Sequence, residues 1–272
     1  MNADWLVPDW PAPPWVGAVC TTRAGGVSAA PFDRMNLGDH VGDAPQDVVA
    51  NRSNFTRQID AKPVFLSQVH QYEVVHLSQG TAHGTVADAC VTRQPGVACT
   101  IMVADCLPVL WVNRLGTVVA AAHAGWRGLA GVPTTAGPVG VLETCFFEFV
   151  ALALGDNEQN SRAAIARDTL VWLGPCIGAS RFEVGDDVRR AFVDPNPQAA
   201  SMFVSTDSGK WLADLQGLAR IRLQHLGIQQ ICGNDGSAPW CTASNPSRFF
   251  SHRRDAAVLG GSGRMAASIW LS

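Results

Sequence analysis

Three residues in the first half of the chain have side chains that bind soft or borderline metal ions. They are His70, Cys106 and His123, and each stands at the end of a short apolar run. A cysteine with two histidines is the ligand set of an open zinc site, in which water or substrate takes the fourth position. The same residue types support another chemistry, with Cys106 as a nucleophile and His123 as its base.

Each of these residues also has an ordinary structural explanation. A single histidine after a strand commonly makes only a hydrogen bond, and cysteine is often buried for packing alone. The intervals of 36 residues between positions 70 and 106, and of 17 between 106 and 123, match no short zinc motif. A metal centre therefore requires a fold that brings the three together.

The apolar runs predict strands that would do so. Residues 109–112 and 117–122 are rich in apolar and β-branched side chains, and a turn is expected at 114–116 between them. If these strands pair antiparallel, Cys106 and His123 lie near one another at one edge of the sheet.

Outside this region the sequence predicts a mixture of helices and strands. Apolar residues at three- and four-residue spacing indicate helices, and Gly227 is a stop signal for the last long one. No internal repeat or linker appears, so residues 1–272 are expected to form a single domain, with a polar surface insertion at 155–161. The predicted helices are 47–59, 141–154, 186–192 and 212–226, and the predicted strands include 16–22, 170–173, 228–232 and 264–271.

Composition favours a globular protein that handles a small molecule. The chain has 272 residues, of which 47% are hydrophobic, so it is long enough to bury a large core. Its 20 basic and 23 acidic residues form no basic block, which speaks against nucleic acid or an anionic membrane as partner. Eight dispersed cysteines without a Cys-x-x-Cys pair or an N-terminal signal peptide predict reduced thiols in the cytoplasm.

Several longer motifs run along nearly the whole chain. In combination they resemble the YfiH/laccase-domain family, whose members are called purine nucleoside phosphorylase, multicopper polyphenol oxidase-like protein and peptidoglycan editing factor PgeF. The motifs are TTRAGGVS (21–28), PFDRMNLGDHVGD (31–43), LSQVHQ (66–71), ADCLPVLW (104–111), AAAHAGWRGLAGV (120–132), WLGPCIGASRFEVG (172–185), DLQGLARIRLQHLGI (214–228), FFSHRRD (249–255) and GRMAASIWL (263–271).

The resemblance implies an α+β fold with mixed β-sheets sandwiched by helices, related in outline to the CNF-like cysteine hydrolases. It places zinc on His70, Cys106 and His123, with copper as the cofactor of the older laccase label. It implies phosphorolysis of adenosine, inosine and S-methyl-5'-thioadenosine, with adenosine deaminase activity, and hence purine nucleosides and phosphate as ligands. A different role is editing of a peptidoglycan precursor, by removal of L-Ser from UDP-MurNAc-L-Ser.

Candidate roles follow for the remaining polar residues. Asp105, next to Cys106, is a candidate general base or ligand orienter. Arg23, in a glycine-containing loop, and Arg127 are candidates for phosphate binding, with a structural salt bridge as the alternative for each. Copper oxidase chemistry fits less well, because an electron path to oxygen requires several copper ions and the chain has only seven histidines.

The sequence departs from the usual family pattern at a few places. Gln71 replaces a common glycine after the first histidine ligand, and segments 145–168 and 256–263 are longer than usual. His252, where tyrosine is common, is expected with Arg253 and Arg254 either to line the substrate site or to form a solvated loop. These changes bear on substrate preference and leave the three ligand residues in place.

Overall fold

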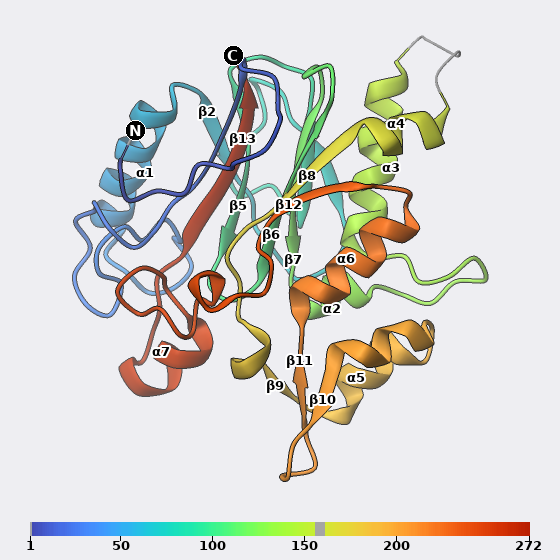
Figure 1. The fold of residues 1–272 in the computed structure, drawn as a ribbon. Helices are drawn as coiled ribbons and strands as arrows, with labels where there is room; N and C mark the ends of the chain where they lie inside the picture. The colour runs from blue at the N-terminus through green and yellow to red at the C-terminus, as the bar shows by residue number, and fades with distance from the viewer. Residues whose placement is uncertain (1, 156–160) are drawn as a thin grey trace.

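Two β-sheets packed face to face form the centre of the computed structural model, which describes residues 2–155 and 161–272 (Figure 1). Most of the insertion predicted at 155–161 therefore lies outside the described residues. Helices cover the outer faces of both sheets, which confirms the expected α+β fold with sandwiched mixed sheets. Within the described ranges, no helix is both long and apolar enough to cross a membrane.

The first sheet carries the C-terminal strand in its interior. Its order is β1 (Val16–Cys20), β13 (Met265–Leu271), β5 (Val97–Val103) and β2 (Lys62–Phe65). β13 pairs antiparallel with both neighbours, whereas β2 runs parallel to β5. The terminal strand expected at 264–271 is confirmed, and it joins the two ends of the chain in one sheet.

The second sheet contains the hairpin that the sequence predicts. β6 and β7 pair antiparallel with Pro108 opposite His123, so the segment before β6 and the end of β7 meet at one edge. The strand order is β12 (Gln230–Gly233), β8 (Thr169–Leu173), β6 (Leu107–Asn113), β7 (Val119–Ala124), β4 (Ala89–Thr92) and β3 (Val74–His76).

Strand periodicity divides the apolar side chains among three layers of core. Along β6, Val109 and Trp111 face helices α3 (Val141–Leu154) and α6 (Leu215–His225), whereas Leu110 packs between the sheets. On the far side, α1 (Pro45–Ile59) covers the first sheet through residues such as Phe55, Phe65 and Trp270. The triad segments are therefore anchored to a rigid interior.

One predicted helix begins later than expected. Residues 211–213 of the helix predicted at 212–226 belong to strand β11, because the Asp214 side chain accepts a hydrogen bond from the Gly217 amide and starts α6 there. A small sheet holds β10 (Phe203–Ser205), β11 (Trp211–Ala213) and β9 (Glu183–Val184).

The remaining helices are short. They are α2 (Trp126–Ala130), α4 (Arg162–Asp168), α5 (Asp186–Val193) and α7 (His252–Leu259), with 3-10 turns at Ala179–Arg181, Pro197–Met202 and Ala238–Trp240. The loop considered around 252–254 is thus the start of α7, where the Ser251 hydroxyl caps the helix by accepting from the Arg254 amide.

Candidate metal centre and active-site cavity

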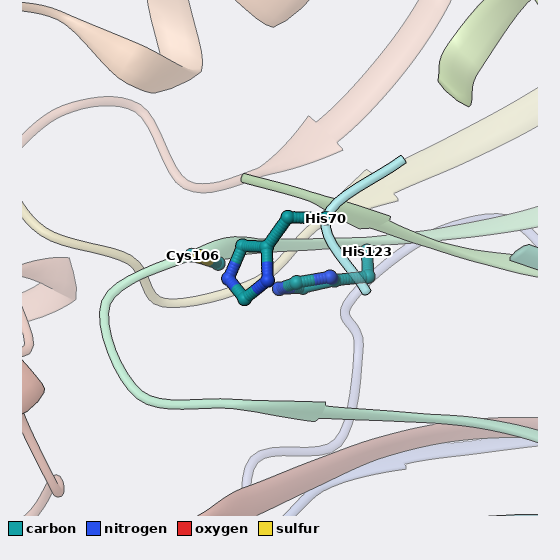
Figure 2. A group of neighbouring side chains, drawn as sticks. All are labelled: His70, Cys106 and His123. Carbon is teal, nitrogen blue, oxygen red and sulfur yellow. The ribbon is translucent and has the colours of Figure 1, made fainter. Parts of the chain in front are cut away.

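His70, Cys106 and His123 meet at the junction of the two sheets. Their ligand atoms all lie within 4.8 Å of one another, and the two imidazole rings are nearly perpendicular, at 74°. Figure 2 shows the three side chains converging from separate segments. His70 follows β2 of the first sheet, Cys106 lies where the chain crosses from β5 to β6, and His123 is in β7 of the second sheet. The junction itself thus gathers the ligands.

The donor set fits a metal ion. Zn–N and Zn–S bonds hold tetrahedral ligands about 3.5 Å apart, so a small closure of the present arrangement suffices. Within residues 2–155 and 161–272, this is the only group of His, Cys, Asp or Glu side chains close enough to hold an ion. A site with three protein ligands keeps a position open for substrate or water.

Asp88 links the two histidines and was not singled out from the sequence. Its carboxylate accepts a hydrogen bond from Nδ1 of His123 at 2.8 Å, which turns the other ring nitrogen toward Cys106. The same carboxylate accepts from the backbone amides of Val69, His70 and Gln71 at 2.8 to 3.1 Å. One buried group therefore fixes the ring of one ligand and the loop of the other. The only signal in the sequence was an acidic residue directly before a buried strand.

The backbone at two site positions is in the left-handed region. His70 has φ 62° and Asp105 has φ 85°, which for side-chain-bearing residues costs on the order of 1–3 kcal/mol each. Asp88 holds the first. The second is held through Asp105 itself, whose carboxylate accepts from the Thr242 hydroxyl at 2.6 Å and the Arg253 amide at 2.7 Å.

These contacts bear on the two roles expected for Asp105. Both carboxylate oxygens are already hydrogen-bonded, and its carbonyl accepts from the Ile177 amide at 2.9 Å. As a general base it would first have to give up one of these bonds. As an orienter it uses all of them, because they fix the turn that presents Cys106.

Two glycines of the 120–132 motif permit close approach. A Cβ at Gly125 would lie 3.0 Å from the Cys106 sulfur and 3.1 Å from Cδ2 of His70. A Cβ at Gly128 would lie 2.5 Å from the carbonyl oxygen of Gln71. The start of α2 can therefore pack directly against the ligands only because these side chains are absent.

The electrostatics favour a thiolate beside an imidazolium. Burial by itself raises the pKa of Cys106, but the adjacent His123 and His70 outweigh it and lower that pKa to about 6. Burial likewise opposes the charge on His123, yet Cys106 and Asp88 raise its pKa to about 9. The metal-free protein at neutral pH thus has one ligand already deprotonated and one proton for a metal ion to displace.

The triad opens into a cavity of about 420 Å³ with two unlike walls. The wall attached to the first sheet is polar, and the opposite wall is apolar. His252 and Arg253 of α7 also line the cavity. The polar wall consists of His40, Gln68, Met102 and Arg264, and the apolar wall consists of Trp126, Ile177, Phe182 and Leu215.

The two arginines expected to bind phosphate lie elsewhere. Arg23 donates to the Asp33 carboxylate at 2.9 Å and to the Pro246 carbonyl at 2.6 Å, and it lines a separate, smaller depression. Arg127 is exposed, with its guanidinium 4.4 Å from the centre of the Trp126 ring. Neither is among the residues that line the triad cavity, so both assignments remain predictions from sequence alone.

The other sequence departures are also placed. His252 and Arg253 line the cavity, whereas Arg254 forms an ion pair with Asp255 at 2.6 Å and donates to the carbonyls of Thr242 and Phe249. Gln71 is exposed beside the ligand loop and does not line the cavity.

Comparison with known proteins agrees with this geometry over the whole chain. A purine nucleoside phosphorylase of Pseudomonas aeruginosa is 46% identical over 272 residues, covering 100% of this chain and 99% of the relative. The purine nucleoside phosphorylase YfiH of Escherichia coli is 44% identical over 271 residues, covering 98% of each.

Solved structures are similar at the same extent. A Neisseria meningitidis protein superposes with a TM-score of 0.85 at 42% identity, covering 99% of each chain. YlmD from Geobacillus stearothermophilus gives 0.81 at 30% identity, covering 100% of this chain and 97% of that one. The family described as multi-copper polyphenol oxidoreductase laccase matches residues 17–272. The chain therefore belongs to this family, the laccase-domain or YfiH family.

Proposed function

We propose that the protein is a metal-dependent purine nucleoside phosphorylase acting on adenosine, inosine and S-methyl-5'-thioadenosine. The observation that carries the proposal is a three-ligand centre opening into a nucleoside-sized cavity with one apolar and one polar wall. The names of the relatives from Pseudomonas aeruginosa and Escherichia coli support the same reaction class.

The metal in this proposal is zinc, held by His70, Cys106 and His123. Two imidazoles and a thiolate suit its borderline-soft character and tetrahedral preference. When bound, it supplies Lewis-acid polarisation and alignment of a substrate or water oxygen. Copper is less consistent with the chain, since the described residues offer one candidate cluster and a multicopper oxidase needs several.

The protein's own residues divide the remaining work. Trp126 and Phe182 offer aromatic surface against which a planar purine can pack, and their wall excludes water from the reacting bond. Asp88 keeps His123 in one orientation, and Asp105 keeps the Cys106 turn fixed, so alignment costs little at the moment of reaction. Deamination of adenosine would use the same cavity, with the purine amino group directed at the centre.

A second candidate is supported by a specific arrangement of three side chains. Cys106, His123 and Asp88 stand in the order thiolate, imidazole and carboxylate, as in a cysteine hydrolase. This arrangement would suit an amidase that releases L-Ser from UDP-MurNAc-L-Ser. The two readings compete, because a metal-bound thiolate is a blunted nucleophile.

The test is product release with and without phosphate. Zinc-loaded protein and Cys106→Ala would each be given adenosine, inosine and UDP-MurNAc-L-Ser. Phosphate-dependent free purine and ribose 1-phosphate, lost in the variant and after chelation, would support the phosphorylase. Inert nucleosides together with serine release that survives chelation would refute it and favour the amidase.

A further inference from the structure

We propose that Arg264, with His40 beside it, forms the subsite that binds the phosphate co-substrate. The inference rests on the proposed phosphorolysis and assigns one of its two substrates to the polar wall. Neither residue was singled out from the sequence as a binding group, although Arg264 lies in the C-terminal motif at the start of β13.

Arg264 is held firmly and still has unused donors. Its backbone amide donates to Oδ1 of Asn36 at 2.8 Å, and its side chain packs on Gly38, where a Cβ would lie 2.7 Å from its Cγ. Nη1 donates to the carbonyls of Ser262 and Gly263 at 2.8 and 3.1 Å. Within the described ranges, its Nε and Nη2 have no protein acceptor, and the side chain lines the triad cavity.

The charge of Arg264 also lacks a local counterpart. Buried Arg222 pairs with Glu143 at 2.6 Å, and Arg254 pairs with Asp255 at 2.6 Å. No such ion pair is formed by Arg264 with any carboxylate of residues 2–155 or 161–272. A largely buried, unpaired guanidinium is costly, and its planar fork suits the oxygens of a phosphate. An anion in the cavity would complete the pairing.

His40 adds a second polar group to the same wall. Burial lowers its pKa, and repulsion from Arg264 lowers it further, so the ring is favoured as a neutral donor. The charged groups facing it are Arg264, Asp39 at 3.5 Å and Arg52, which itself pairs with Asp39 at 3.1 Å. The nearby Gln68 amide is fully engaged with the Met102 backbone, which keeps this wall rigid.

The stereochemistry of the reaction supports this side of the cavity. A phosphate oxygen forms a bond to the anomeric carbon while the carbon–nitrogen bond breaks and its electron pair leaves with the purine. The proton of hydrogenphosphate ends on the released base. Nucleophile and leaving group lie on opposite sides of the carbon, so a purine on the Trp126 and Phe182 wall puts phosphate on the Arg264 wall.

The experiment combines direct binding with kinetics on the zinc-loaded full chain. Equilibrium dialysis would measure binding of radiolabelled inorganic phosphate to wild type, Arg264→Met, Arg264→Lys and the matched control Arg127→Met. We expect Arg264→Met to weaken binding by about tenfold to a hundredfold, the scale for a hydrogen bond to a charged group, with partial recovery in the lysine variant. KM for phosphate should rise equally, with KM for inosine unchanged.

Each other outcome has a definite meaning. Unaltered phosphate binding in Arg264→Met, absence of binding in wild type, or an equal loss in Arg127→Met would overturn the inference. If wild type binds phosphate through Arg264 but releases no purine, the subsite stands and the proposed phosphorolysis fails. Tighter binding of UDP than of phosphate, lost in Arg264→Met, would reassign the subsite to a nucleotide diphosphate. Equal zinc content and equal thermal midpoints show that the variants are folded.

Discussion

The two walls of the cavity differ in how the protein fixes them. On the polar wall, Arg264 and Gln68 are held by hydrogen bonds to backbone groups, which leave defined donors facing the cavity. On the apolar wall, Phe182 and Leu215 belong to the core that packs under the second sheet. The metal centre lies at the seam, with ligands from both sheets. A charged co-substrate and a flat apolar one can thus be held on separate rigid surfaces and meet at one point.

Removing the seam should have the largest effect. Cys106→Ala deletes the thiolate ligand, so we expect loss of bound zinc and a fall in turnover of roughly a thousandfold, the scale for losing a central electrostatic group. Metal analysis and purine release measure both. Cys232→Ala, which changes a half-buried cysteine that does not line the cavity, is the control and should retain both. A zinc-free Cys106→Ala that turns over normally would contradict a metal-centred seam.

Loosening the link between the sheets should have the next largest effect. Asp88→Asn leaves one acceptor oxygen where the carboxylate serves three backbone amides and His123. We expect zinc affinity to fall by about tenfold to a hundredfold, as measured by competition with a chromophoric chelator. The exposed Asp168→Asn variant is the matched control. Unchanged zinc affinity in Asp88→Asn would mean that the two ligand segments are held independently.

The pH dependence of zinc binding tests the charges at the seam. Between the Cys106 pKa of about 6 and the His123 pKa of about 9, the metal displaces one proton, from His123. Over that window affinity should rise about tenfold per pH unit, and below pH 6 more steeply, because the thiol proton must also leave. Calorimetry in buffers of different ionisation enthalpy counts the protons. Release of two protons from these groups at pH 7.5 would rule out the preformed thiolate.

The smallest expected effect separates the two walls directly. Phe182→Leu keeps the site apolar but removes an aromatic face, so KM for inosine should rise about threefold to tenfold while KM for phosphate is unchanged. The control, Phe147→Leu, changes a phenylalanine that is 39% exposed and does not line the cavity. This is the mirror image of the Arg264→Met result. A rise in KM for phosphate instead would exchange the roles of the walls.

Local signals in the sequence were sufficient for much of the fold. The helix at 141–154 forms with those bounds because its apolar spacing is local and the Glu143 carboxylate accepts from the Gly140 amide at its start. The hairpin that brings Cys106 and His123 together follows from two strands joined by a short turn. The helix predicted at 212–226 began too early, since pairing of Leu212 with Glu183, a contact distant along the chain, overrode helical spacing.

By itself the sequence determined the ligand residue types, the strands that carry them and the family. Only the tertiary structure decided what supports and surrounds them. Asp88 serves both histidines, Thr242 bonds Asp105 across 137 positions, and Arg264 enters the cavity through contacts with Asn36 and Gly38. Periodicity and turn signals depend on neighbours a few residues apart, whereas a carboxylate clamp or a cavity wall depends on segments that become neighbours only when the sheets pack.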